Sequence, residues 1–157
     1  MNLTASQLYK KISKYESLAS EKAIKKAYNL SKKAHTNQYR GSGEEYFTHP
    51  LAVADYLIGM KLDSSTIITA LLHDVVEDSE ISLQNIKDEF GLEISKLVDG
   101  VTKLSKLDLR FGFAQAENFR KLLLASSDDI RVLLVKLADR LHNIRTINGI
   151  KNDNKRS

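Results

Sequence analysis

The sequence predicts an all-α fold in one domain. The chain has 157 residues with only one proline and seven glycines, a composition that favours helices over a turn-rich β protein. No segment alternates apolar and polar residues for long enough to predict a strand. Apolar residues instead recur every three or four positions behind capping residues, which is typical of helices that bury one face. At this length about two-thirds of the unfolded surface can be buried, which is enough for a core without disulfides.

Two helices are expected before residue 38. The first follows Thr4, whose side chain can form a capping box with that of Gln7. Ser20 is placed to cap the second helix. The apolar face of this helix consists of Ala23, Ile24, Ala27, Tyr28 and Ala34. Residues 38–48 contain two glycines and a serine, so they are expected to form a loop.

Two further helices are expected next. Pro50 is expected at the first position of the third helix, where its missing N–H costs nothing. Asp63 is placed to cap a fourth helix that runs from Ser64 to about Val76 and is mostly apolar. The residues expected to be buried by the third helix are Leu51, Ala54, Leu57 and Ile58.

The following part of the chain is expected to contain one exposed connection between helices. Ser82 can cap a fifth helix that Gly91 ends. A sixth helix follows, and residues 102–113 are expected to form the exposed connection before a seventh helix over residues 116–125. The apolar positions of the sixth helix are Ile94, Leu97, Val98 and Val101.

The last expected helix runs from Ile130 to about Ile147, with Asp128 or Asp129 as its cap. It has two apolar sides, which predicts a central, buried helix. The polar residues 149–157 are expected to fray. One side carries Val132 and Val135, and the other carries Leu134, Leu137, Leu141 and Ile144.

Composition and charge exclude several classes of protein. The chain has no cysteine, which excludes disulfides, thiolate metal sites and a cysteine nucleophile. No apolar run reaches the roughly 20 residues of a membrane span, and the N-terminus lacks the apolar stretch of a signal peptide. We therefore expect a soluble, cytoplasmic protein with no membrane partner.

The N-terminal region is basic. Residues 1–40 hold nine of the 24 Lys and Arg residues but only two of the 20 Asp and Glu residues. Such a region can attract an anionic ligand, although a solvated lysine-rich helix face is the alternative. Aromatic residues do not alternate with the basic ones, so a nucleic-acid partner is not expected.

A histidine and three carboxylates follow the apolar stretch of the fourth helix. In a continuous helix Glu77 lies one turn from His73, and Asp78 lies one turn from Asp74. Negative charge is unfavourable at a helix C-terminus, and no Lys or Arg lies between residues 61 and 87 to neutralise it. A divalent cation would relieve the repulsion. A solvated acidic helix end is the alternative.

Asp139 is a second candidate for the same site. It lies on the valine side of the last helix, and Asn143 projects the same way one turn later. A buried, ionised carboxylate must be paired, hydrogen-bonded or bound to a metal. The alternative to a metal is a buried ion pair with Arg131, Arg140 or Arg145.

His49, at a junction between loop and helix, can supply a second imidazole. The alternative for His49 is a structural role, which is also what we expect for His35 and His142. Two histidines and two aspartates would form a site of nitrogen and oxygen ligands. Such ligands suit Mn²⁺, Fe²⁺, Zn²⁺ or Mg²⁺ with positions left open for water.

Six stretches resemble, in order and spacing, the hydrolase domain of the RelA/SpoT family, within the HD phosphohydrolase superfamily. The similarity runs from about residue 5 to residue 147, and the fifth stretch is most similar to the SpoT branch. The stretches are AHTNQYRGSGE (34–44), YFTHP (46–50), LHDVVED (72–78), VDGVTKL (98–104), AENFRK (116–121) and VKLADRLHN (135–143).

The resemblance implies a multi-helix HD fold with a central buried metal site over residues 1–148. Residues 149–157 would be a polar tail, with no synthetase or regulatory domain. The implied metal ligands are His49, His73, Asp74 and Asp139, and the family's usual metal is Mn²⁺. Glu77 and Asp78 match the acidic pair that positions and deprotonates the attacking water. The positions that match nucleotide contacts are Arg40, which packs on the guanine base in the family, Ser42, Asn143 and Thr146.

The implied reaction is hydrolysis of the 3′-pyrophosphate of the alarmone (p)ppGpp, which gives GDP or GTP and pyrophosphate. Gly41 departs from the family, which often has a basic residue at this position. The family's domain also continues through further helices after the last motif. The alternatives are therefore an HD phosphohydrolase for another nucleotide, or a non-catalytic remnant that binds a nucleotide or a partner protein.

Overall fold

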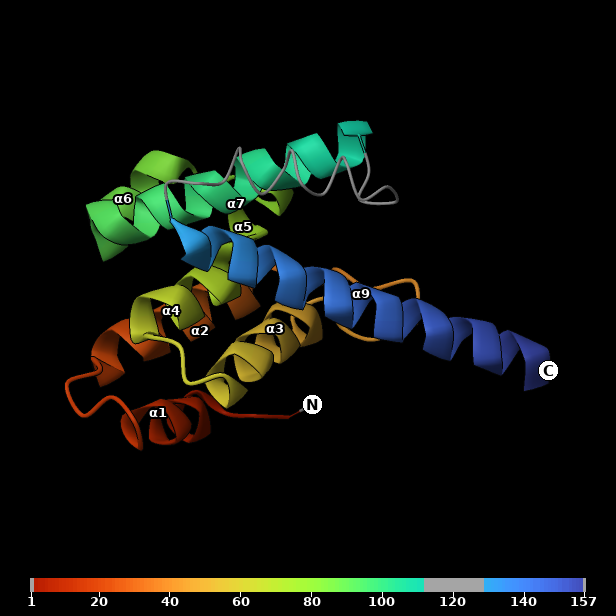
Figure 1. The fold of residues 1–157 in the computed structure, drawn as a ribbon, viewed down its shortest axis with the longest axis horizontal. Helices are drawn as coiled ribbons and strands as arrows, with labels where there is room; N and C mark the ends of the chain where they lie inside the picture. Colours follow the sequence, from red (N-terminus) through yellow and green to blue (C-terminus); the bar gives the residue numbers. More distant parts are fainter. Residues whose placement is uncertain (1, 112–128, 157) are drawn as a thin grey trace.

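Helices make up most of the chain in the computed structural model, which describes residues 2–111 and 129–156. Within these ranges there is no strand, only one isolated bridge between Tyr39 and Glu45. The all-α prediction is therefore confirmed. Figure 1 shows α6 and α7 along one side and α1 to α4 along the other, with α9 running between them towards the C-terminus. In these ranges no helix is both long and apolar enough to span a membrane.

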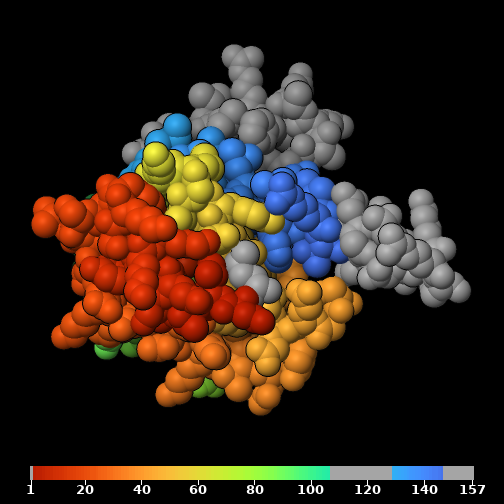
Figure 2. Space-filling model, turned by 90° about the horizontal axis from the view of Figure 1, so that it is seen from below, coloured from red at the N-terminus to blue at the C-terminus, as the bar shows by residue number. Residues whose placement is uncertain are grey.

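The N-terminal helices begin at the predicted caps. Helix α1 (Ala5–Ser13) starts with the capping box of Thr4 and Gln7, and α2 (Glu21–Ala34) starts at Ser20, whose side chain accepts a bond from a backbone N–H. The hydroxyl of Tyr28 donates to the carbonyl of Leu3 at 2.6 Å and ties the N-terminal segment to α2. Seen from below, α1 and α2, drawn in red and orange, cover the left part of this face, and α9, drawn in blue, lies at the right (Figure 2).

Helix α3 (Thr48–Gly59) begins two residues earlier than predicted. Pro50 is therefore its third residue rather than its first. The first few N–H groups of a helix have no partner within it, so the proline still sacrifices no helical hydrogen bond. His49 becomes the second residue of the helix and is buried. The four apolar residues predicted to be buried are buried: Leu51, Ala54, Leu57 and Ile58.

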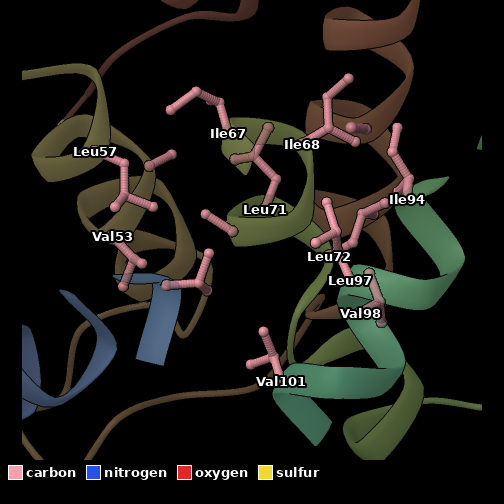
Figure 3. Close-up of a cluster of buried hydrophobic side chains, with 14 of the residues drawn as sticks. Val53, Leu57, Ile67, Ile68, Leu71, Leu72, Ile94, Leu97, Val98 and Val101 are labelled. Carbon is pink, nitrogen blue, oxygen red and sulfur yellow. The ribbon is translucent and has the colours of Figure 1, made fainter. Parts of the chain in front are cut away.

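Helix α4 (Ser64–Leu72) lies at the centre of the core. The side chain of Asp63 caps it, and every residue from Thr66 to Leu72 is buried. Such all-round burial is expected for a helix that is apolar on every side. Helix α4 packs against α2, α3, α7 and α9. In Figure 3, side chains of α4 such as Leu71 lie between those of α3 and α7.

The prediction of one continuous helix to Val76 is wrong. Helix α4 ends at Leu72, and after a two-residue turn the short helix α5 covers Val75–Asp78. The ring nitrogen Nδ1 of His73 lies 2.6 Å from the carbonyl oxygen of Ala70, which in a continued helix would accept from the N–H of Asp74. The bond from the His73 side chain favours the end of α4 here, directly before Asp74, the first of the three carboxylates.

Helices α6 (Leu83–Phe90) and α7 (Leu92–Phe111) confirm the cap at Ser82 and the break at Gly91, whose φ is +94°. The predicted exposed connection over residues 102–113 is wrong, because α7 continues to Phe111. Val101 and Leu104 are buried and extend the apolar spacing of the helix. Gly100 lets α9 approach α7, since a Cβ there would lie 2.8 Å from a methyl carbon of Val132.

Helix α9 spans Ile130–Arg156 and is longer than predicted. Asp129 supplies the cap, because its carboxylate accepts the backbone N–H of Arg131 at 3.0 Å. The helix passes residues 147–149, where the sequence predicted its end. The predicted helix over residues 116–125 lies outside the described residues.

The prediction that α9 is buried on two sides is also wrong. The side with Val132, Val135 and Asp139 faces the core. On the other side Leu137, Leu141 and Ile144 are 37%, 41% and 46% exposed. The apolar pattern alone could not distinguish a covered from an uncovered side.

Candidate metal centre and active site

Four side chains from distant parts of the chain meet in the interior. His49 comes from the first turn of α3, His73 and Asp74 from the turn between α4 and α5, and Asp139 from the core side of α9. One donor atom from each lies within 4.8 Å of the others. Asp74 is half-buried, and the other three are buried. These four are the residues that the sequence proposed as metal ligands.

The inner atoms of this cluster are two imidazole nitrogens and two carboxylate oxygens. Oδ1 of Asp139 lies 2.5 Å from Nε2 of His49 and 3.2 Å from Nε2 of His73. Oδ2 of Asp74 lies 3.0 Å from Nε2 of His73 and 3.9 Å from Nε2 of His49. Each imidazole thus directs its Nε2 atom to the same small volume.

The outer nitrogen of each imidazole is held by a partner. Nδ1 of His73 donates to the carbonyl oxygen of Ala70. Nδ1 of His49 lies 2.7 Å from Nδ1 of His142, and the centroids of the two rings are 4.9 Å apart. Metal-binding histidines commonly bond through their second nitrogen in this way, which orients the ring.

Each carboxylate is also held by a neighbouring side chain. The hydroxyl of Tyr46 donates to Oδ2 of Asp74 at 2.7 Å. The ammonium of Lys136, one turn before Asp139 on α9, lies 3.1 Å from Oδ2 of Asp139. Oδ1 of Asp139 therefore faces the two imidazoles while its other oxygen faces a cation.

The acidic pair lies on α5, immediately after this cluster. The side chains of Glu77 and Asp78 are exposed, so water can reach them. The side-chain amide of Gln38 donates to the backbone carbonyl of Asp78 at 3.0 Å and attaches α5 to the loop after α2. Gln38 is held in turn by Nδ1 of His35 at 3.0 Å.

Three of the four candidate nucleotide contacts lie together. The guanidinium of Arg40 donates to the side-chain oxygen of Asn143 at 2.9 Å and lies 3.4 Å from the hydroxyl of Thr146. It also lies over the ring of Tyr46, 5.9 Å from its centroid. Ser42 is exposed two residues further along the same loop.

Comparison with known proteins identifies the family. Residues 27–157 match the family described as HD domain. The chain belongs to the HD-domain family. This HD domain is 52% identical over 151 residues to "GTP pyrophosphokinase rsh" of Brucella melitensis, a match that covers 96% of this chain and 20% of that protein. It is 50% identical over 136 residues to "Bifunctional (p)ppGpp synthase/hydrolase SpoT" of Escherichia coli K12, covering 86% of this chain and 19% of that protein.

A solved structure supports the same family. It is described as "A metazoan ortholog of SpoT hydrolyzes ppGpp and plays a role in starvation responses". The TM-score is 0.64 and the identity 28%, over 83% of this chain and 72% of that one. The HD domain spans about a fifth of the length of the curated relatives it matches.

The charges in the cluster of this HD domain are strongly coupled. Burial alone would lower the pKa of His73, but Asp74 and Asp139 outweigh burial and raise the pKa well above its usual value. Burial also opposes ionisation of Asp74, yet His73 lowers the pKa of that carboxyl to about 2. Burial lowers the pKa of His49, and His49 and His73 hold the pKa of Asp139 far below its usual range.

The donor set fits a divalent cation. Two neutral imidazoles and two carboxylates supply nitrogen and oxygen ligands and two negative charges, which suits Mn²⁺, Zn²⁺, Fe²⁺ or Mg²⁺. Arg131 does not pair with Asp139, because it contacts Asp63, Glu93 and Asp129. The alternative of a solvated helix end does not fit His73, which is 2% exposed.

The pKa of each exposed acid is raised. Partial burial, Asp74 and Asp78 raise the pKa of Glu77. Partial burial and Asp74 raise the pKa of Asp78. A carboxylate with a raised pKa is a stronger base, which suits proton abstraction from water.

Sequence reasoning missed four residues that support the cluster: Tyr46, Lys136, His142 and Gln38. Lys136 and His142 stand three residues before and after Asp139, a spacing that puts them near its side of α9. This spacing was a usable signal. Tyr46 and Gln38 lie in a loop, where no periodicity indicates direction.

Proposed function

We propose that this HD domain hydrolyses the 3′-pyrophosphate of (p)ppGpp and releases pyrophosphate and GDP or GTP. The observation that carries the proposal is the buried cluster of two imidazoles and two carboxylates directly before an exposed acidic pair. The identity of about half to proteins named for (p)ppGpp hydrolysis supports this substrate. We place the hydrolase domain at residues 1–148, followed by the polar residues 149–157.

His49, His73, Asp74 and Asp139 would hold one divalent cation, for which we propose Mn²⁺. A bound cation of this kind lowers the pKa of a water molecule and offsets charge on phosphoryl oxygens. The surrounding residues orient these ligands. Tyr46 and Lys136 each hold one carboxylate.

We assign Glu77 and Asp78 to the attacking water. Their exposed carboxylates would orient the water and accept a proton from it as its oxygen attacks the phosphorus next to the ribose. The bond from this phosphorus to the ribose 3′-oxygen breaks, so pyrophosphate leaves, and the 3′-oxygen takes up a proton. The raised pKa of each makes it a better base than an ordinary surface carboxylate. Proton transfer to a positioned base typically contributes about 10²- to 10⁴-fold to the rate.

Arg40, Ser42, Asn143 and Thr146 would bind the nucleotide. The guanidinium plane of Arg40 can stack on a guanine base, as it lies over Tyr46 in the structure. Asn143 and Thr146 fix this guanidinium from α9 and place nucleotide binding next to Asp139 on the same helix. The basic N-terminal region adds long-range attraction for an anionic substrate.

The test is pyrophosphate release from ppGpp in the presence of Mn²⁺. The wild type is compared with the double variant Glu77→Gln/Asp78→Asn, which keeps the shape of both side chains and removes both bases. We expect release by the wild type and a loss of about 10²-fold or more in the double variant. Equal rates in the two proteins would refute the assignment of the acidic pair.

A panel of other nucleotides separates the alternatives. Faster hydrolysis of a nucleotide without a 3′-pyrophosphate would indicate an HD phosphohydrolase of different specificity. Binding of both Mn²⁺ and ppGpp without any turnover would indicate a non-catalytic binding domain.

A further inference from the structure

His142 lies outside the four ligands and the acidic pair, yet it contacts one of the ligands directly. We infer that His142 is a positioning residue: it accepts the Nδ1 proton of His49 and thereby keeps Nε2 of His49 free to bind the metal. This inference rests on the metal site of the proposed function. It concerns affinity for the cation, which can be measured without turnover.

The argument starts from the geometry of the two rings. Nδ1 of His49 and Nδ1 of His142 are 2.7 Å apart, a hydrogen-bond distance that allows only one of the two atoms to carry the proton. The planes of the two rings differ by only 28°, and their centroids are 4.9 Å apart. The proton position decides which nitrogen of His49 has a free electron pair.

Two arrangements are possible. If His142 donates, neutral His49 carries its own proton on Nε2 and donates it to Oδ1 of Asp139 at 2.5 Å. If His142 accepts, His49 carries its proton on Nδ1, and the Nε2 electron pair points at Asp139 and His73. Only the second arrangement lets His49 bind a cation through Nε2, so metal binding requires His142 as an acceptor.

The other imidazole of the cluster provides an internal comparison. Nδ1 of His73 bonds to the carbonyl oxygen of Ala70, which can only accept a proton. His73 is therefore fixed with Nδ1 protonated. His142 can hold the proton of His49 on Nδ1 in the same way, but its side chain can also donate. The nitrogen of His49 that carries the proton therefore depends on the residue at position 142.

The position of His142 on α9 links this support to Asp139. Its backbone carbonyl accepts a bond from the hydroxyl of Thr146 at 2.6 Å. Asp139 lies one turn earlier on the same helix. One helix thus presents both a ligand and the group that orients a second ligand from α3.

The experiment compares His142→Phe with His142→Asn. Phenylalanine keeps a flat ring but cannot accept a proton, whereas Oδ1 of asparagine can take the place of Nδ1. We expect Mn²⁺ affinity, measured by calorimetry, to fall about 10- to 100-fold in His142→Phe, the usual effect of losing such a partner. His142→Asn should recover most of that loss.

Tyr56→Phe is the matched control. The ring of Tyr56 also lies near His142 but takes no part in the hydrogen bond between His49 and His142. Its Mn²⁺ affinity should equal that of the wild type. A second readout is imidazole ¹⁵N NMR of the Zn²⁺-bound wild type, in which Nδ1 of His49 should be protonated.

The inference is overturned if His142→Phe binds Mn²⁺ as tightly as the wild type, or if His142→Asn is no better than His142→Phe. Absence of cation binding by the wild type would also overturn it. Tight Mn²⁺ binding without hydrolysis of ppGpp would refute the proposed function alone, since the affinity comparison remains valid.

Discussion

Replacing Tyr46 with phenylalanine removes one hydroxyl from the candidate metal centre and leaves the ring in place. That hydroxyl donates to Oδ2 of Asp74 at 2.7 Å, and the Asp74 side chain is only 15% exposed. A hydrogen bond to a charged group contributes about 1.5–3 kcal/mol. Because a bound cation would share the carboxylate charge, we take the lower end, which corresponds to about tenfold weaker Mn²⁺ binding.

Calorimetric titration with Mn²⁺ measures this loss directly. Tyr28→Phe is the matched control, because its hydroxyl donates to the carbonyl of Leu3, in the N-terminal segment rather than in the metal centre. The control should lose stability but keep the wild-type affinity for Mn²⁺. If Tyr46→Phe binds Mn²⁺ as tightly as the wild type, the view that Tyr46 orients a metal ligand is refuted.

Four further predictions follow from the same contacts. Leu71→Ala, at a fully buried position of α4, should cost about 2–5 kcal/mol in urea denaturation, and a surface-like cost would contradict the central place of α4. In the metal-free protein, ionised Asp74 should stabilise the fold above a pH of about 4 by about 2 kcal/mol, and this should be lost as the pH falls towards its folded pKa of about 2. Denaturation of Asp74→Asn should lack this loss, and an identical pH profile in both proteins would refute it. Arg40→Ala should raise KM for ppGpp about tenfold with unchanged Mn²⁺ affinity, whereas an unchanged KM would argue against nucleotide contact. Saturation with Mn²⁺ at about 100 times its Kd should stabilise the wild type by about 2.7 kcal/mol, and an unchanged Tm would argue against a metal site.

Local signals in the sequence were sufficient for the starts of α1, α2, α4 and α6. Thr4, Ser20, Asp63 and Ser82 cap the helices that they were predicted to cap, because a capping bond involves residues three apart in the chain. Such a bond depends little on the rest of the fold. The same holds for the break at Gly91, where φ is positive.

Tertiary contacts explain the errors. Helix α4 ends at Leu72, and the side chain of the next residue, His73, bonds to the carbonyl of Ala70. This contact belongs to the ligand cluster, so helix propensity does not predict it. Helix α7 continues through residue 102 because Leu104 is buried. The apolar side of α9 at Leu137 is exposed, although its pattern resembles that of a buried side.

The grouping of the four candidate ligands was predictable, but among the supporting residues only Lys136 and His142 gave a signal, through their spacing from Asp139. His73 and Asp139 stood out because each is a polar residue at a position where the helical pattern predicts an apolar one. His142 shows no such mismatch. Its partner His49 is 93 residues away, and only the fold brings the two rings together.

The most direct test of the account is pyrophosphate release from ppGpp as Mn²⁺ is titrated into the metal-free protein. The rate should rise to saturation with the same Kd that calorimetry gives for Mn²⁺ binding, and Asp139→Asn should require far more Mn²⁺. A rate that does not depend on Mn²⁺, or no release from a protein with Mn²⁺ bound, would contradict a metal-dependent hydrolase built on His49, His73, Asp74 and Asp139.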